Sequence, residues 1–253
     1  MKVRMSEIKN IRLILQYEGT NYHGWQRQKD DVTIQELIEG KLEMMTGRPV
    51  TLHASGRTDA GVHALHQVCN FFTESRIPPE SIRNGLNSLL PDDILIKKSE
   101  YVGPDFHSRY SVKSKSYEYR ILNARDRDIF LRRYTWHIRD DLDFSEMRKC
   151  LSFVIGKHDF SAFRSTGTGN VNPVREMFRA ELSGRGEGGG AYFFFEAEGF
   201  LKHMVRNIVG TIVDVGKGKI SSDEFRKILE SGDRKKAGYK APPQGLFLKM
   251  VTY

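Results

Sequence analysis

The stretch that decides the fold is residues 11–47, IRLILQYEGTNYHGWQRQKDDVTIQELIEGKLEMMTG. Apolar side chains first alternate with polar ones, which is typical of a half-buried strand; they are Ile11, Leu13, Leu15 and Tyr17. Thr33, followed three residues later by Glu36, predicts a capping box at the start of a helix. The apolar face of this helix is Ile34, Leu37, Ile38, Leu42 and Met45, and Gly47 ends it. A strand followed, after a loop, by a helix predicts a mixed α and β fold.

Working outward, the rest of the first half repeats both kinds of element. Strands are expected at 50–54, 68–72 and 94–102. A helix is expected to begin at Pro79 and to stop at Pro91. The resulting order, β-α-β-β-α-β, is the ferredoxin-like arrangement, and we assign it to a domain of residues 1–105.

The second half predicts nearly the same order over residues 106–253. Strands are expected at 117–121, 134–138 and 246–250, a hairpin at 174–182 and 192–198, and helices capped by Asp143 and Ser221 or running from Phe200 to Val215. The fold class is therefore α+β, with two similar ferredoxin-like halves whose antiparallel sheets carry helices on one face. No low-complexity linker separates the halves, so we expect them to pack around a cleft suited to a ligand.

Composition narrows the partners and the compartment. The chain has 253 residues, 39% of them hydrophobic, which excludes a disordered or fibrous protein. The net charge of +8 favours an anionic partner, nucleic acid before membrane. Cys69 and Cys150 form no CxxC pair, so we expect two buried thiols in a reducing, cytoplasmic compartment. No apolar core follows Met1–Arg4 and no apolar run approaches bilayer length, so we expect neither a signal peptide nor a membrane span.

Two patterns suggest sites that their context disfavours. Residues 184–189, GRGEGG, match GxGxxG, but they separate two hairpin strands and no helix follows to receive a phosphate. We interpret them as a flexible turn. His53, His63 and His66 lie close in sequence, yet no cysteine or acidic residue stands at a metal-ligand spacing. Surface or base-stacking histidines, with no metal, are the preferred interpretation.

Three segments carry candidate chemistry. Gly56 and Gly61 permit tight turns on either side of Asp59, which predicts a carboxylate at a loop tip; an ordinary turn aspartate is the alternative. On the helix expected from Phe200, one polar flank is predicted to hold Lys202, His203, Arg206 and Asn207. Tyr117 and Tyr119 point to one side of a strand, where they either stack bases or form the edge of the core.

Four blocks carry a family resemblance, and they occur in family order through nearly the whole chain: 17–28 (YEGTNYHGWQRQ), 56–64 (GRTDAGVHA), 115–120 (KSYEYR) and 203–210 (HMVRNIVG). A fifth and weaker block is 158–163 (HDFSAF). On these blocks the chain resembles the tRNA pseudouridine synthase A (TruA) family.

The resemblance implies an isomerase that converts uridine to pseudouridine at positions 38, 39 and 40 of the tRNA anticodon stem-loop. It implies a cytoplasmic homodimer that uses neither cofactor nor metal and has its active site in a basic cleft between the two halves. Asp59 would be the nucleophile, Arg206 would favour its anionic form, and Tyr117 would stack on the base. Substrate contacts would come from Arg57, His63, His203 and Asn207. The residues do not distinguish attack of Asp59 on C6 of the base, attack on C1′ of the sugar, and assistance in forming a glycal.

Two other classes of protein explain part of the pattern. A non-catalytic RNA-binding module accounts for the charge and the tyrosines. A metal-assisted hydrolase using Asp59, His63 and His66 would lose its activity to a chelator. Further cations are candidates for the RNA path without an assigned site: Arg27, Lys97, Lys98, Arg109, Lys113, Arg164 and Arg175.

Overall fold

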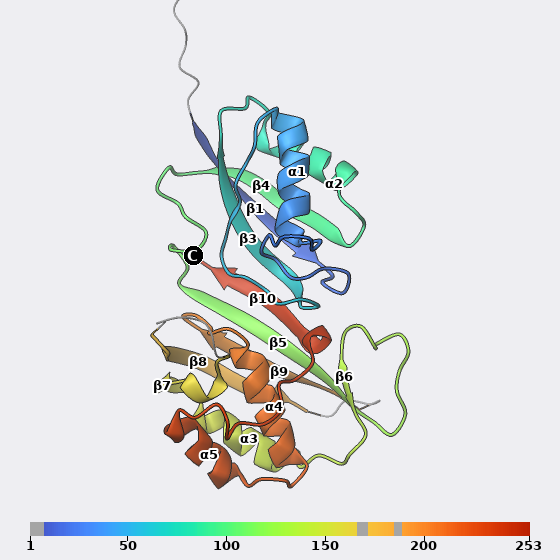
Figure 1. Cartoon of the computed structure of the whole chain (residues 1–253), viewed down its shortest axis with the longest axis vertical. Coiled ribbons are helices and arrows are strands. Elements are labelled where there is room, and N and C mark those ends of the chain that lie inside the picture. The colour runs from blue at the N-terminus through green and yellow to red at the C-terminus, as the bar shows by residue number, and fades with distance from the viewer. Residues whose placement is uncertain (1–7, 166–171, 185–188) are drawn as a thin grey trace, which may run out of the picture. The chain divides into compact units, whose positions relative to one another are not determined.

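A computed structural model describes residues 8–165, 172–184 and 189–253 (Figure 1). The chain divides into two compact units: unit 1 is residues 1–113 with 248–253, and unit 2 is residues 114–247. Both units combine helices with β-strands, so the predicted α+β class is confirmed. The independent domains 1–105 and 106–253 stay a prediction, and the division seen here places the end of the chain with unit 1.

Unit 1 is built around a central strand. Its elements are β1 (Lys9–Tyr17), α1 (Ile34–Thr46), β2 (His53–Ala54), β3 (His63–Thr73), α2 (Pro79–Leu89) and β4 (Ile94–Val102), in the predicted order. Strand β1 pairs antiparallel with both β3 and β4, and β2 pairs with β3. Strand β10 (Leu246–Thr252), which belongs to unit 1 from residue 248 onward, neighbours β3.

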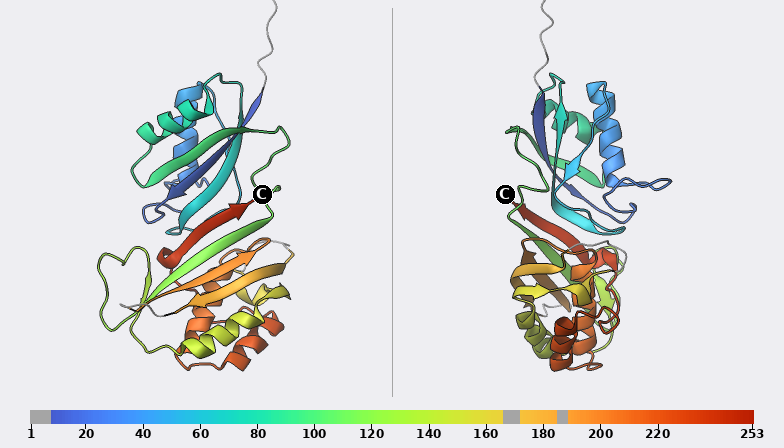
Figure 2. Two further views of the ribbon diagram at one scale, coloured as in Figure 1. Left: turned by 180° about the vertical axis from the view of Figure 1, so that it is seen from behind. Right: turned by 60° about the vertical axis from the view of Figure 1, so that its left-hand side comes forward.

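The helices α1 and α2 cover one face of the sheet of unit 1 (Figure 2). The alternation that predicted β1 places Ile11, Leu13 and Leu15 in the core without exposed surface. Apolar residues at helical spacing, Ile38 of α1 and Leu86 of α2 among them, are likewise fully buried. Burial of this apolar face is the main stabilising contribution to the unit.

Unit 2 combines β-strands with the helices that cover them. Its elements are β5 (Ser114–Asn123), β6 (Trp136–Ile138), α3 (Phe144–Phe153), β7 (Gly156–Asp159), β8 (Val174–Ser183), β9 (Gly190–Ala197), α4 (Met204–Gly216) and α5 (Ser222–Ser231), with 3₁₀ turns at Ser161–Phe163 and Pro243–Gly245. The strand order is β5-β9-β8-β7, antiparallel throughout, and β6 pairs parallel to β5. Strands β8 and β9 form the predicted hairpin. Most of the GxGxxG turn between them, residues 185–188, lies outside the described residues.

The helix starts test the predicted caps. Asp143 accepts hydrogen bonds from the amides of Ser145 and Glu146, and Ser221 forms a complete capping box with Glu224, so both caps are confirmed. The capping box predicted for α1 was wrong. Thr33 occupies the N-cap position, but its side chain makes no cap hydrogen bond, and the Glu36 carboxylate lies 3.5 Å from Arg27 Nε.

Two elements of unit 2 differ from the prediction. The helix expected from Phe200 begins at Met204, because His203 adopts a left-handed backbone conformation with φ of 63°. Strand β7 was not predicted, since its sequence, Gly-Lys-His-Asp, lacks an apolar alternation.

Both cysteines are free and buried, as predicted, and burial raises the pKa of the Cys150 thiol to about 12. Among the described residues, no helix has the length and apolar character needed to cross a membrane.

Candidate active site

The Asp59 loop, residues 55–62, joins β2 to β3 in unit 1. The Trp25 amide donates to the Thr58 carbonyl at 3.1 Å, and the Val62 amide donates to the Asp59 carbonyl at 3.1 Å. Both peptide groups that flank Asp59 are therefore hydrogen-bonded. Gly61, with φ of 75°, makes the turn that the sequence predicts there. The backbone thus holds a half-buried carboxylate in a loop with little freedom to move.

Two glycines of the segment after β1 press against this loop. A Cβ atom at Gly19 would lie 2.0 Å from the Val62 carbonyl oxygen. At Gly24, where φ is 89°, it would lie 2.6 Å from the Thr58 carbonyl oxygen. Only glycine permits these approaches, since any side chain would collide with backbone. The sequence blocks 17–28 and 56–64 therefore meet in space and support one another.

His63 and Arg57 flank Asp59 in different environments. His63 is 1% exposed, and its Nδ1 accepts a hydrogen bond of 3.0 Å from the Gly19 amide, which places the hydrogen of the neutral ring on Nε2. Arg57 is exposed, and within the described ranges no residue pairs with its guanidinium. The exposed cation is available for an anionic ligand, whereas His63 supports the fold.

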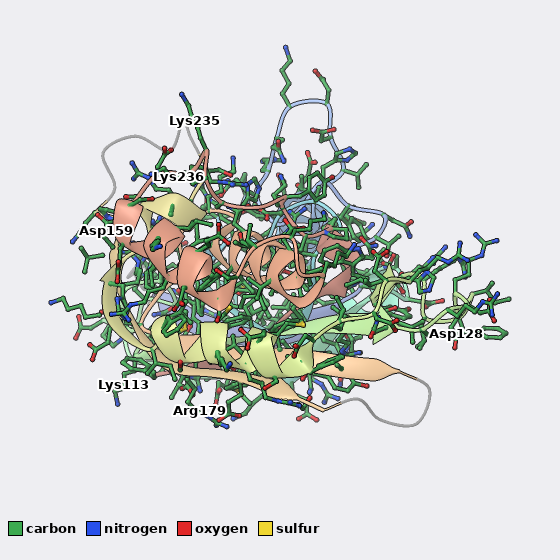
Figure 3. All side chains as sticks on the ribbon, turned by 90° about the horizontal axis from the view of Figure 1, so that it is seen from below. Lys113, Asp128, Asp159, Arg179, Lys235 and Lys236 are labelled. Atoms are coloured by element: carbon green, nitrogen blue, oxygen red, sulfur yellow. The ribbon has the colours of Figure 1, made fainter. Side chains whose placement is uncertain are left out.

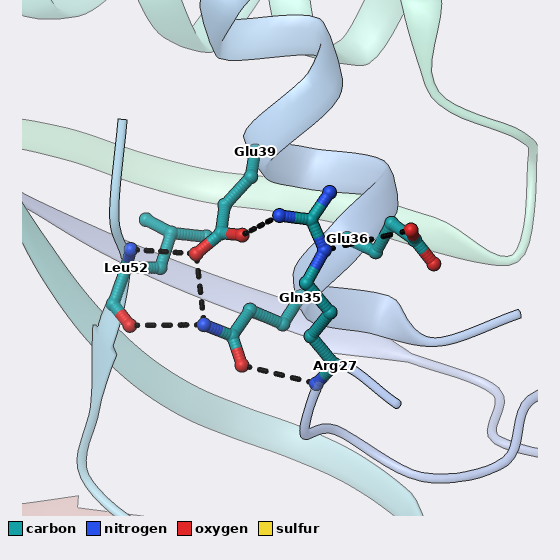
Figure 4. A network of polar contacts seen from close by, with 5 residues as sticks. All are labelled: Arg27, Gln35, Glu36, Glu39 and Leu52. Atoms are coloured by element: carbon teal, nitrogen blue, oxygen red, sulfur yellow. Dashed lines mark hydrogen bonds and ion pairs between the residues drawn. The ribbon is translucent and has the colours of Figure 1, made fainter. Parts of the chain in front are cut away.

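A polar network links Arg27, the first turns of α1 and the segment before β2 (Figure 4). The Gln35 side chain accepts from the Arg27 amide at 3.2 Å and donates to Glu39 Oε1 at 2.8 Å. The same carboxylate oxygen accepts from the Leu52 amide at 2.9 Å. Glu39 therefore connects α1 to the segment that leads into β2, and Arg27 Nη1 lies 3.8 Å from its second oxygen.

In unit 2 the predicted tyrosines occupy different settings. Tyr117 on β5 is 8% exposed, and its ring meets the edge of Phe200 with centroids 4.9 Å apart. Tyr119 has no exposed surface, and its hydroxyl donates to the Pro242 carbonyl at 2.8 Å. Burial raises the pKa of Tyr119 well above its ordinary value. Tyr119 is thus a core residue, and Tyr117 is the candidate for the site.

Two hydrogen bonds join Arg206 to Ala241. Its Nε donates to the Ala241 carbonyl at 2.8 Å, and the Ala241 amide donates to the Arg206 carbonyl at 3.1 Å. Only 6% of Arg206 is exposed. Gly210, one turn later, allows the segment around Tyr239 to pack closely against α4, because a Cβ atom there would lie 1.7 Å from the Tyr239 carbonyl oxygen.

The predicted polar flank of Lys202, His203, Arg206 and Asn207 was wrong. Lys202 and His203 precede α4 instead of lying on it, and Arg206 and Asn207 are buried. The His203 ring hydrogen-bonds to Ser165 through Nδ1. The Asn207 side chain donates to the Phe163 carbonyl at 2.8 Å and accepts from Arg234 at 3.0 Å. The pattern of the sequence did not reveal Arg234, whose partner is far from it along the chain.

The three histidines proposed as an alternative metal site lie in separate environments. The His53 ring lies 4.9 Å from that of His107, whereas His63 is bonded to Gly19. Burial lowers the pKa of His66, whose Nδ1 is buried without a partner in the described part of the chain. Over that same part, no group of three or more histidine, cysteine or acidic side chains is arranged to hold a metal ion.

The surface cations divide into paired and unpaired groups. Lys98 pairs with Glu100 at 2.8 Å, and Arg179 pairs with Glu181 at 2.8 Å. Lys235 and Lys236 lie at the surface of unit 2 after α5 (Figure 3). Pairing with a carboxylate weakens the case for an RNA contact, so Lys98 loses support as a candidate, as does Arg27, which lies 3.5 Å from Glu36.

Comparison with known proteins agrees with the resemblance. The model of a family described as tRNA pseudouridine synthase matches residues 13–111 and 152–253. These ranges contain Asp59 and Arg206, and Tyr117 lies between them.

Relatives match along nearly the whole chain. The tRNA pseudouridine synthase A of Acetivibrio thermocellus is 47% identical over 246 residues, which cover 97% of this chain and 100% of the relative. With the same coverage of both chains, the proteins of that name from Thermoanaerobacter pseudethanolicus and Geotalea uraniireducens are 46% and 45% identical.

Proposed function

The chain belongs to the tRNA pseudouridine synthase family, and on that basis we propose that it isomerises uridine to pseudouridine in the anticodon stem-loop of tRNA, at positions 38, 39 and 40. The observation that carries the proposal is the match of the family over the ranges that hold Asp59 and Arg206. The fixed backbone on both sides of Asp59 supports it, because a nucleophile must be held in place.

The reaction breaks the N1–C1′ bond, turns the base over and joins C5 to C1′. It is an isomerisation without redox change, so it needs no cofactor or metal. Asp59 acts as the nucleophile, and a covalent step divides one difficult bond exchange into two easier ones. The carboxylate must be ionised to do this, and a neighbouring cation favours the ionised form.

Arg206 supplies that cation in the proposed active site, and Tyr117 stacks on the uracil ring. The exposed guanidinium of Arg57 contacts phosphate or takes the space of the extruded base, which costs a few kcal/mol to unstack. His63, His203 and Asn207 complete the proposed substrate site. The ring of His63 is hydrogen-bonded to Gly19 and the side-chain amide of Asn207 to Phe163. These two residues therefore position the site more than they contact substrate.

The proposal extends to the assembly. Two similar halves enclose the active-site cleft, two copies of the chain form a homodimer that binds one tRNA across both subunits, and the enzyme works in the cytoplasm. A net charge of +8 supports binding of a polyanion, and such binding falls steeply with salt.

A tritium-release assay tests the activity. A tRNA transcript labelled at C5 of uridine loses tritium to water when pseudouridine forms. Wild type should release the label equally with and without EDTA, and Asp59→Asn should release none. Absence of release by wild type that binds the transcript tightly would overturn the enzymatic proposal, and loss of release with EDTA would favour a metal-assisted reaction.

A further inference from the structure

We propose that Gln67 of β3 is a positioning residue for the proposed nucleophile, acting with Tyr17 through a buried hydrogen-bond network that holds the Asp59 loop. The inference rests on the proposed function, since it assigns a catalytic consequence to the geometry of Asp59. Neither residue entered the list of site residues that the sequence predicts. The available signal is the amide of Gln67, which stands between the apolar residues Leu65, Cys69 and Phe71 in the alternation along β3.

Gln67 uses the whole hydrogen-bonding capacity of its side chain. Its Oε1 accepts from the Ser55 hydroxyl at 2.7 Å and from the Val68 amide at 3.1 Å. Its Nε2 donates to the Gly56 carbonyl at 2.9 Å and makes a longer contact of 3.5 Å with the Tyr17 hydroxyl. The Val68 amide can only donate and the Gly56 carbonyl can only accept, so the orientation of the Gln67 amide is determined.

Tyr17 carries the network from β1 to the residue before Asp59. Its hydroxyl lies 2.8 Å from Thr58 Oγ1. Burial raises the pKa of Tyr17 above its ordinary value, so the phenol stays protonated. Tyr17 is 4% exposed, Thr58 is 7% exposed, and Gln67 has no exposed surface. A hydrogen bond shielded from water in this way is costly to leave unmade.

These contacts hold the Asp59 loop on its N-terminal side. Gln67 holds Ser55 and Gly56, and Tyr17 holds Thr58, so the network reaches the loop up to the residue before Asp59. Beyond Asp59 the loop is closed by the Val62 amide. Loss of the Gln67 amide would free the part of the loop before Asp59, whereas the turn closed by the Val62 amide would stay in place. A displacement of about 1 Å at a reacting group is enough to cost about 100-fold in rate.

The same strand offers a matched control. Asn70 on β3 also has no exposed surface and also serves a buried network. Its Nδ2 donates to Asn10 at 2.9 Å, and its Oδ1 accepts from the Ser108 amide at 2.9 Å. Among the described residues, the side chain of Asn70 bonds to Asn10 of β1 and to Ser108 after β4, neither of which lies in the Asp59 loop. Asn70→Leu therefore removes a comparable buried amide away from the proposed nucleophile.

The experiment compares Gln67→Leu with Asn70→Leu in the full chain. The tritium-release assay gives kcat and KM, filter binding gives the affinity for tRNA, and thermal unfolding gives Tm. Thr58→Val and Thr58→Ser form a second pair, since the first removes the hydroxyl that Tyr17 holds and the second keeps it. This pair decides the question if Gln67→Leu does not fold.

We expect Gln67→Leu and Thr58→Val to lower kcat by about 10- to 100-fold with KM and tRNA affinity within about twofold of wild type. Asn70→Leu should lower Tm with kcat unchanged, and Thr58→Ser should keep most of the activity. Equal losses of kcat in Gln67→Leu and Asn70→Leu at matched Tm would overturn the positioning role, as would a Thr58→Ser variant as slow as Thr58→Val.

Hydrogen exchange separates this inference from the proposed function. The amides of Trp25 and Val62 report the two hydrogen bonds that flank Asp59, and they need no activity. The Val62 amide closes the turn beyond Asp59 and should exchange alike in both variants, whereas the Trp25 amide should exchange at least about tenfold faster in Gln67→Leu than in Asn70→Leu. Unchanged exchange of the Trp25 amide overturns the inference whether or not wild type releases tritium, whereas faster exchange in a protein that releases none overturns the proposed function alone.

Discussion

The Asp59 loop of unit 1 and the start of α4 in unit 2 hold their functional side chains in different ways. Asp59 lies in a segment without regular structure, where Trp25 and Val62 bond the flanking peptide groups. Arg206 lies inside a helix, whose backbone hydrogen bonds are local, and its side chain donates to the Ala241 carbonyl. The backbone geometry of the loop therefore depends on contacts with distant segments, whereas that of the helix is set by its own local hydrogen bonds.

This difference predicts how each region fails. A change near the loop should disturb chemistry first, because the loop has no regular secondary structure and its position depends on hydrogen bonds with distant segments. A change against α4 should disturb stability first, because the helix is packed on nearly all sides and has a dozen buried positions.

The largest expected effect tests the loop directly. Asp59→Asn should lower kcat by about 1,000-fold or more, because it removes the nucleophile and keeps the shape of the side chain. Its affinity for tRNA, measured by filter binding, should stay within about twofold of wild type. A variant that keeps substantial turnover would remove Asp59 from the centre of the reaction.

A matched pair of glycine variants compares the two regions. Gly24→Ala forces a side chain onto a backbone with φ of 89° and against the Thr58 carbonyl, and Gly210→Ala forces one against the Tyr239 carbonyl. Each should lower the free energy of unfolding by about 2 kcal/mol, measured by urea denaturation. Below the unfolding transition, Gly24→Ala should also lower kcat by about tenfold or more, since the Asp59 loop is displaced. Equal kcat in the two variants would contradict the proposed difference.

Tyr117 provides a smaller and more local test in unit 2. Tyr117→Ala removes the ring that meets Phe200 and should lower kcat/KM by about 10- to 100-fold, in line with the loss of one stacked base. Tyr117→Phe keeps the ring, so its loss should be several-fold smaller. Equal losses in steady-state kinetics would assign the effect to the hydroxyl instead of the stacking face.

The smallest effect is a stability change that leaves both regions alone. Glu100 on β4 is partly buried, but hydrogen bonds from Lys98 and Arg12 hold its pKa below the ordinary 4.5. A carboxylate with a lowered pKa stabilises the folded state at pH values above its ordinary pKa. That contribution is lost as the pH falls through the pKa of the folded state. Glu100→Gln should therefore cost up to about 1 kcal/mol at pH 7 and almost nothing near pH 3, by denaturant unfolding, with kcat unchanged. A constant cost at both pH values would exclude the ionised carboxylate as its cause.

Much of the fold was predictable because its signals are local. Helix α2 begins at the predicted Pro79, and β4 spans the predicted Ile94–Val102. Proline at the first turn and an apolar alternation act through the chain itself, so neighbours do not change their meaning. The cap at Ser221 was predictable for the same reason.

The failures occur where a partner from elsewhere competes with the local signal. Glu36 has the spacing of a capping box with Thr33, yet it lies 3.5 Å from Arg27, which arrives from the preceding loop. His203 carries a helical pattern, yet its left-handed conformation and its bond to Ser165 delay the start of α4. Long-range contacts outweigh such preferences, which are worth only about 1 kcal/mol.

The amino-acid sequence was enough to predict the α+β class, most of the helices and strands, the family, and Asp59 as the candidate nucleophile. Each block of the family is a continuous stretch of residues, so it can be recognised without a structure. The folded chain was needed to see that Gln67 and Tyr17 hold the Asp59 loop, that Gly24 lies against it and that the Ala241 carbonyl accepts a hydrogen bond from Arg206. These contacts join residues far apart in the chain, and no local preference encodes which distant segment will meet a given loop or helix.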